Sequence, residues 1–173
     1  MSRAVERVAR DVVLRWDQTA WPIARRFGIG RDLLLALVCQ ESAGDPSARR
    51  EEPGFLRVYN AGIVKSLARV PNAQDRRRYL EWYARQPIAL ATSYGLCQVL
   101  NIVAIEFGVR LAEVMSQTDP ATSLEAGCAK LRACLQATHG DVSKALLRYN
   151  GGGAPQYDDE VLAWRALVAT ALG

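Results

Sequence analysis

The sequence contains no long hydrophobic run. Charged residues interrupt every apolar stretch well before the roughly 20 residues that a membrane-spanning helix needs. The N-terminal residues, which include Arg3, Glu6 and Arg7, lack the apolar core of a secretory signal peptide. We therefore expect no stable membrane insertion and no signal peptide. A substrate outside the cytoplasm would then require a delivery route that the chain does not supply.

Residues that bind transition metals are also scarce. The chain has one histidine, His139, and four cysteines, none of which forms a Cys-x-x-Cys pair. The cysteines are Cys39, Cys97, Cys128 and Cys134. Each lies in an apolar stretch expected to be helical, where a reduced cysteine behaves as a small hydrophobic residue. We interpret them as core residues and expect no metal and no cofactor.

Neither sign of charge is in large excess over the other. Lys and Arg total 22 against 18 Asp and Glu, which gives a net charge of +4 at pH 7. This excess is too small and too scattered to indicate a nucleic-acid-binding protein. Arginine clusters at 25–26, 49–50 and 76–78 suit an anionic polymer such as cell-wall glycan with its peptide carboxylates. A solvated basic face explains each cluster at least as well.

Most of the chain has the apolar spacing of helices, and no strand pattern is convincing. Half of the 173 residues are hydrophobic, which is enough for one domain with a core. The sequence predicts an all-α or nearly all-α protein. The predicted helices cover 2–16, 19–27, 32–41, 74–86, 95–107, 121–138, 141–149 and 158–172.

Residues 45–74 contain several prolines and glycines and little helical period. The pattern predicts a long irregular segment, apart from a turn or two of helix near 63–68, with room for a small β-hairpin. Long loops in compact domains are usually functional, so this segment is a candidate part of a site.

Glu41 is unusual because it ends an apolar helix. Leu34, Leu37 and Val38 precede it by spacings that share one helix face, so its carboxyl group is expected to face the core. Burial disfavours the charged form of a carboxyl group, raises its pKa and keeps it protonated near neutral pH, as a general acid requires. The alternative is a solvated carboxylate at the helix end.

Two further segments combine glycine with polar residues. Ser93 and Gly95 are expected to begin a helix that carries Gln98. Gln98 would bind a sugar hydroxyl or amide group; the alternative is an ordinary helix glutamine. The Tyr-Asn-Gly-Gly sequence at 149–152 is typical of a helix end with a left-handed glycine cap. The cap explains the glycines but not the tyrosine and asparagine beside them.

In this order, the three segments resemble the motifs of one enzyme family. Glu41-Ser42, Gly-Leu-Cys-Gln at 95–98 and Tyr-Asn-Gly-Gly at 149–152 are similar to the Glu-Ser, Gly-Leu-Met-Gln and Ala-Tyr-Asn-Gly-Gly motifs of soluble lytic transglycosylases. The resemblance runs from about Trp21 to Trp164. Cysteine at 97 and arginine at 148 depart from the usual methionine and alanine, which bears on the subfamily more than on the chemistry.

The segment from Glu41 to Phe55 resembles the phage-encoded members more closely. These often carry an Arg-x-Glu-Pro step, which is present here from Arg50 to Pro53. A phage member without a signal peptide would reach the cell wall by holin-type release or as a component of the virion.

The resemblance implies a lysozyme-like domain over 19–173, preceded by an N-terminal amphipathic helix over 1–18. Its substrate would be the β-1,4 bond between N-acetylmuramic acid and N-acetylglucosamine in peptidoglycan glycan strands. Glu41 would be the single catalytic acid, and the muramoyl 6-hydroxyl would close onto C1 as a 1,6-anhydro ring. The residues expected to line the sugar cleft are Ser93, which would also hydrogen-bond near Glu41, and Gln98, Leu100 (through its backbone), Tyr149 and Asn150.

Glu51 and Glu52 leave a second outcome open. If one of them reached the cleft it would hold a water, and the enzyme would be a hydrolytic muramidase. Glu52 is the better candidate because it matches the Glu of the Arg-x-Glu-Pro step. Alternatively, one of the two pairs with Arg49 or Arg50 or orders the loop.

Two non-enzymatic classes of protein also fit the sequence. One is a peptidoglycan-binding or phage structural module that kept the fold without the reaction. The second is a helical interaction protein that does not bind the cell wall. Whichever of these functions applies, we expect a monomer that binds no nucleic acid and does not insert stably into a membrane.

Overall fold

The computed structural model describes residues 3–109 and 118–173, apart from the side chains of 59–61. The described chain is mainly helical, with one small three-stranded sheet, and so confirms the predicted fold class. Residues 1 and 2, with which the predicted N-terminal segment begins, lie outside the described residues. Within the described ranges, no helix is both long and apolar enough to cross a membrane.

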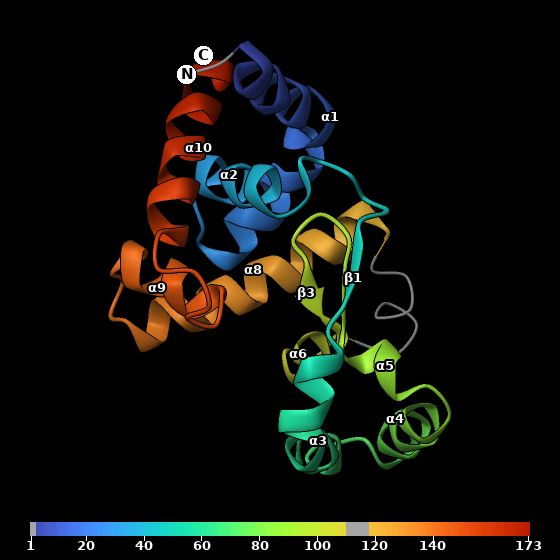
Figure 1. Ribbon diagram of the computed structural model, residues 1–173. Coiled ribbons are helices and arrows are strands. Elements are labelled where there is room, and N and C mark those ends of the chain that lie inside the picture. Colours follow the sequence, from blue (N-terminus) through green and yellow to red (C-terminus); the bar gives the residue numbers. More distant parts are fainter. Residues whose placement is uncertain (1–2, 110–117) are drawn as a thin grey trace.

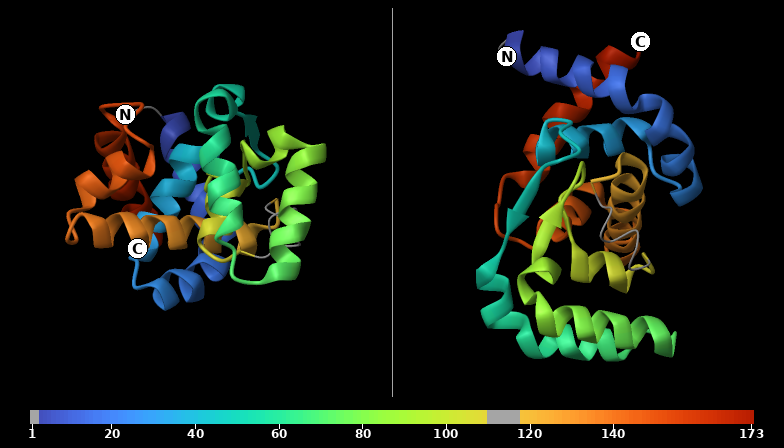
Figure 2. Two further views of the ribbon diagram at one scale, coloured as in Figure 1. Left: turned by 90° about the horizontal axis from the view of Figure 1, so that it is seen from below. Right: turned by 90° about the vertical axis from the view of Figure 1, so that its right-hand side faces the viewer.

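Five helices form the larger part of the molecule (Figure 1). They are α1 (Arg3–Phe27), α2 (Arg31–Ser42), α8 (Pro120–Ala137), α9 (Val142–Tyr149) and α10 (Tyr157–Leu172). Helix α2 packs against α1 and α10, and α8 packs against α1 and α9. The start of α1 and the end of α10 lie at the same end of the molecule (Figures 1 and 2).

Helix α2 is the centre of the core. Every residue from Leu33 to Cys39 is buried, as expected for a helix that is apolar on all sides. All four cysteines are free thiols, and each is buried as the sequence predicted. The helix ends at Ala43, which has a left-handed backbone (φ 50°).

The predicted helices 2–16 and 19–27 form one continuous helix, α1. The buried residues Ala9, Val12, Ala20 and Ile23 keep one helical stripe across the expected break. Their packing against α2 and α8 maintains the helix, although Pro22 lacks the N–H group for one backbone hydrogen bond.

The smaller part contains the sheet and four helices (Figure 2). These helices are α3 (Pro53–Ala68), α4 (Ala73–Arg85), α5 (Pro87–Leu90) and α6 (Asn101–Glu106). The antiparallel sheet has the order β1 (Arg49–Glu51), β2 (Thr92–Tyr94) and β3 (Val99–Leu100). In its register, Ser93 lies opposite both Arg50 and Leu100.

The prediction of an irregular segment over 45–74 was wrong for α3. Pro53 occupies the first turn of α3, where its missing N–H costs no hydrogen bond. Ile63 and Leu67, four positions apart, are buried and hold the helix to the core. Strand β1 does lie in this segment, but its partner is β2 and not a second strand within 45–74.

The prediction of a helix over 95–107 was also wrong in its first half. Residues 92–100 form the β2–β3 hairpin, and the helix begins at Asn101. Gly95 and Gln98 have positive φ angles of 69° and 44°, which a helix does not accommodate.

Candidate active site

Glu41 lies in the last turn of α2. Leu34, Leu37 and Val38 are completely buried on the preceding turns. Burial raises the pKa of the Glu41 carboxyl above its ordinary value, and a hydrogen bond from Tyr157 and the charges of Lys130 and Arg50 offset this only in part. The pKa of this carboxyl group is therefore shifted in the direction that a general acid needs.

Ser42, the second residue of the Glu-Ser pair, fixes the end of α2. Its hydroxyl lies 2.9 Å from the Leu96 carbonyl oxygen and 3.2 Å from that of Val38, and it also accepts a hydrogen bond from the Gly44 backbone N–H. These contacts attach the helix that carries Glu41 to the β2–β3 turn. Two of the three motifs are thus joined directly.

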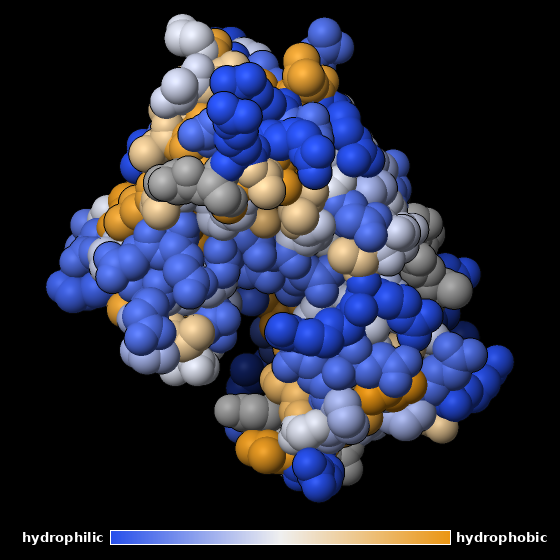
Figure 3. Space-filling model, turned by 45° about the horizontal axis from the view of Figure 1, so that its top comes forward, coloured by the Kyte–Doolittle hydropathy of each residue, from blue (hydrophilic) through white to orange (hydrophobic). Residues whose placement is uncertain are grey.

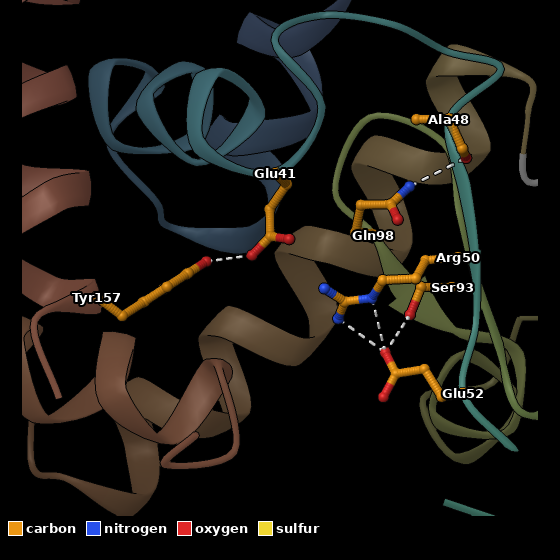
Figure 4. A network of polar contacts seen from close by, with 7 residues as sticks. All are labelled: Glu41, Ala48, Arg50, Glu52, Ser93, Gln98 and Tyr157. Atoms are coloured by element: carbon orange, nitrogen blue, oxygen red, sulfur yellow. Dashed lines mark hydrogen bonds and ion pairs between the residues drawn. The ribbon is translucent and has the colours of Figure 1, made fainter. Parts of the chain in front are cut away.

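Tyr157 is a site residue that the sequence analysis missed. It is the first residue of α10, it is buried, and its hydroxyl donates a hydrogen bond to Oε1 of Glu41 (Figure 4). Burial and the neighbouring Glu41 raise the pKa of Tyr157, so the phenol remains a donor. Its only signal in the sequence is its place at the start of a predicted helix, shortly after the glycine-rich segment.

A cavity of about 370 Å³ opens in front of Glu41. The surface is deeply hollowed between the two parts of the molecule, with hydrophilic residues on both sides (Figure 3). The cavity brings together every residue that the sequence assigned to the site. Its lining is Glu41, Arg50, Glu52, Phe55, Ser93, Gln98, Leu100, Val103, Lys130, Arg148, Tyr149, Asn150 and Gly151.

A larger cavity of about 570 Å³ lies between α3, α4 and α6, and none of the predicted site residues lines it. The candidate site is therefore the smaller cavity, where the motifs and the buried acid meet.

Glu52 follows β1 and faces the cavity from the side opposite Glu41 (Figure 4). Its Oε1 accepts hydrogen bonds from Nη2 of Arg50 at 2.8 Å and from the hydroxyl of Ser93 at 3.3 Å. Ser93 was expected beside Glu41, but its hydroxyl contacts Glu52. Glu51 pairs with Arg49 at 2.8 Å and does not line the cavity.

Gln98 lies in the β2–β3 turn and not on a helix. Its Nε2 donates to the backbone carbonyls of Ala48 at 3.0 Å and Gly95 at 2.9 Å (Figure 4). The side chain therefore ties the turn to the chain just before β1, and its carbonyl oxygen is the part left to face a ligand.

Tyr149 lines the cavity with its ring, while its hydroxyl points into the protein. That hydroxyl donates to the buried Cys97 carbonyl oxygen at 2.8 Å, so its proton is already engaged within the protein. The ammonium group of Lys130 lies 4.1 Å from the centre of the ring. Tyr149 thus connects α9 to the β2–β3 turn and supports a cation at the wall of the cavity.

Asn150 ends α9, and glycines with positive φ follow it, as the capping pattern predicted. Its Nδ2 is buried and has no hydrogen-bond partner in the described chain. A buried amide donor without an acceptor is costly unless a ligand supplies one. Because Asn150 lines the cavity, this donor is available to a bound molecule.

The described residues hold no group of three or more His, Cys, Asp or Glu side chains that could bind a metal ion.

Comparison with known proteins identifies the family. The model of the transglycosylase SLT domain matches residues 21–161, well over half of the chain and all three motifs. Comparisons with curated proteins and with solved structures gave no significant match. Members of the matching family are lytic transglycosylases, enzymes that act on peptidoglycan. The chain therefore belongs to the transglycosylase SLT domain family.

Proposed function

We propose that the protein cleaves the β-1,4 bond between N-acetylmuramic acid and N-acetylglucosamine, with Glu41 as its single catalytic residue. The observation that carries this proposal is the half-buried Glu41 carboxyl, whose pKa is raised and which faces a cavity lined by the other motif residues. A protonated carboxyl group beside a groove is the donor that glycosidic bond cleavage requires.

In the proposed reaction, Glu41 gives its proton to the bridging oxygen as the bond from that oxygen to C1 breaks. The resulting carboxylate takes the proton of the muramoyl 6-hydroxyl while that oxygen bonds to C1. The glutamate is thereby returned to its protonated form, and the product has a 1,6-anhydro ring. Because the nucleophile is tethered to the reacting sugar, a large effective molarity replaces a positioned water.

Tyr157 would orient the acid. Its hydroxyl holds Oε1, which leaves Oε2 of Glu41 to carry the transferable proton (Figure 4). The same hydrogen bond stabilises the carboxylate formed after proton transfer, while burial favours the acid. The two effects together would keep the pKa of Glu41 in a range where it can both donate and accept a proton.

Asn150 and Gln98 would bind the sugar. The unsatisfied Nδ2 of Asn150 is suited to a carbonyl or hydroxyl oxygen, and the Gln98 carbonyl is suited to an N–H or O–H group. Sugar N-acetyl and hydroxyl groups offer both kinds of partner.

A hydrolytic muramidase is the second candidate, because Glu52 lines the same cavity and could hold a water. Its carboxyl oxygen Oε1, however, is already bound by Arg50 and Ser93. We therefore favour the anhydro product, with Glu52 ordering the junction between β1 and α3.

Purified sacculi digested in isotopically labelled water separate these candidates. The proposal predicts muropeptide ends that are lighter by one water than reducing ends and that carry no label. Labelled reducing ends would establish hydrolysis. Unchanged turnover by Glu41→Gln would exclude Glu41 as the acid, and absence of turnover by the unaltered protein would favour a binding module.

The phage-type assignment is also a proposal. It rests on the Arg-x-Glu-Pro step, in which Arg50 and Glu52 form an ion pair and Pro53 begins α3. Release through a holin or incorporation in a virion would be the corresponding routes to the cell wall. The monomeric state is a further prediction that light scattering of the purified protein would test.

A further inference from the structure

The wall of the cavity formed by α8 and α9 carries two cations, Lys130 and Arg148. Among the residues that the structure describes, neither has a carboxylate within ion-pair distance. Lys130 is half-buried, and its ammonium group lies over the ring of Tyr149. Burial lowers the pKa of Lys130, which shows that the ammonium group has lost part of its solvation.

The carboxylates of the same cavity are engaged elsewhere. Glu52 is paired with Arg50, and Glu41, whose pKa is raised by burial, accepts a hydrogen bond from Tyr157. Glu41 and Glu52 act on Lys130 through their charges and partly oppose the effect of its burial, but neither forms an ion pair with Lys130 or Arg148 in the described chain. A half-buried cation in that position is stabilised by a ligand that brings a negative charge.

Lys130 and Arg148 also lie where two cavities meet. A second cavity of about 380 Å³ adjoins the first and shares Val103, Lys130 and Arg148 with it. The rest of its lining is Glu106, Phe107, Ala133 and Cys134. Glu106 accepts a hydrogen bond from Ser66 on α3 and has no ion pair with either cation. A group that branches from a chain bound against Glu41 would therefore have room beside Lys130 and Arg148.

Hydrogen-bond donors dominate the part of the cavity wall around Lys130 and Arg148, with the unsatisfied Nδ2 of Asn150 nearby. The ammonium of Lys130, the guanidinium of Arg148 and the unsatisfied Nδ2 of Asn150 are all donors. The complementary group is rich in acceptors and negatively charged, which describes a carboxylate and not a sugar hydroxyl.

We propose that Lys130 and Arg148 form a subsite for a carboxylate carried by the side group of the muramoyl sugar. This inference rests on the proposed function, because it requires a glycan strand bound against Glu41. The carboxylate has two sources: the lactyl group of a muramic acid without a peptide, and the peptide stem itself. In either case the subsite selects a muramoyl strand over a neutral strand of N-acetylglucosamine.

The test measures binding in a Glu41→Gln background, where no turnover occurs. Three probes are used: chitotetraose, which has no carboxylate; a peptide-free glycan of alternating N-acetylglucosamine and N-acetylmuramic acid, which has the lactyl carboxylate; and a disaccharide peptide, which has stem carboxylates. The readout is the affinity for each carboxylate probe divided by the affinity for chitotetraose, measured by calorimetry at two salt concentrations.

Lys130→Met and Arg148→Gln should each lower this ratio about tenfold, because each removes one charge-assisted contact. The probe whose ratio falls identifies the source of the carboxylate. Arg132→Gln is the matched control, since Arg132 lies on the same helix, is exposed and lines neither cavity. Its ratio should not change, and added salt should reduce the ratio of the parent protein.

Three results would overturn the subsite. These are a parent protein without preference for either carboxylate probe, a ratio that both cavity variants leave unchanged, and an equal fall in Arg132→Gln. Arg148 is exposed, so Arg148→Gln keeps the test decisive if Lys130→Met unfolds. Failure of the proposed reaction would appear instead as sacculus products without anhydro ends, whatever the binding ratios.

Discussion

The side chains around Glu41 act on its pKa in opposite directions. Burial raises the pKa, whereas the hydroxyl of Tyr157 and the charges of Lys130 and Arg50 lower it. A residue with this balance can release and recover one proton in a single turnover. Substitutions of these neighbours therefore test the role of Glu41 through its pKa.

Tyr157→Phe is expected to move the pH profile upward. Loss of the hydroxyl removes a hydrogen bond that lowers the pKa of Glu41, so the acid should ionise at a higher pH. The alkaline limb of kcat/KM should shift to higher pH while the maximum falls, since Glu41 loses its orienting contact. A limb that stays in place or moves to lower pH would contradict the role given to Tyr157.

Tyr149→Phe should reduce stability more than catalysis. The change leaves the buried Cys97 carbonyl without its donor, at a cost of about 1–2 kcal/mol in the free energy of unfolding. The ring that lines the cavity and supports Lys130 remains in place. Denaturant unfolding and kcat are measured on the same preparation. If the hydroxyl contacted substrate, kcat would fall while the free energy of unfolding stayed unchanged.

Secondary elements differ in how well the sequence predicted them. Helix α8 begins with a capping aspartate, Asp119, followed by proline, and α9 begins with the capping Asp141, so both have local start signals and a regular apolar face. Helix α3 has an opening proline but also two glycines, and only its packing through Ile63 and Leu67 decides its structure.

The β2–β3 hairpin could not be predicted from local pattern. Its strands are very short, and its turn depends on positive φ at Gly95 and Gln98. Long-range bonds hold that turn, from Gln98 to the Ala48 carbonyl and from Ser42 to the Leu96 carbonyl. Such tertiary contacts produce no periodic pattern of apolar residues from which a strand could be predicted.

Gly127→Ala tests the contact between α8 and this hairpin. A Cβ at Gly127 would lie 2.5 Å from Sγ and 2.6 Å from Cβ of Cys97, so the turn or the helix must move. We expect a loss of about 1–3 kcal/mol in stability, together with lower activity. Gly62→Ala on α3 is the matched control, because a Cβ there meets no atom within 4 Å.

The control should raise helix stability by up to about 1 kcal/mol. If Gly127→Ala and Gly62→Ala changed the thermal unfolding equally, the close contact with Cys97 would not be the reason for a glycine at position 127.

At the scale of the whole molecule, the site is assembled from distant parts of the chain. Glu41, the β2–β3 turn and the end of α9 line one cavity at the boundary between the two parts of the molecule. The sequence predicted this set of residues from three motifs. It could not reveal Tyr157 and Lys130, because no motif sets them apart and only folding brings them to Glu41 and its cavity. Arg50 and Arg148 lie within the quoted motifs, but the sequence analysis assigned them no place in the cleft.

A buried acid at this boundary should also reduce global stability. Glu41 has a higher pKa in the folded state than in the unfolded chain, so the folded state loses stability as the pH rises from the unfolded pKa through the folded one. Glu41→Gln removes this loss. Its Tm should exceed that of the unaltered protein above that window, and the difference should shrink at acid pH.

A Tm difference that is independent of pH, or of the opposite sign at neutral pH, would indicate that Glu41 is not held in its protonated form by burial. Calorimetric scans of both proteins over a pH series would distinguish these results.

The central claim is that Glu41 stays protonated at a pH where ordinary glutamates are ionised. Isotope-edited NMR of the side-chain carboxyl groups measures this directly, with Glu41→Gln identifying the resonance that belongs to residue 41. The account predicts that this resonance titrates above the ordinary glutamate pKa of about 4.3, and higher still in Tyr157→Phe. Titration at the ordinary value, with the other glutamates, would contradict it.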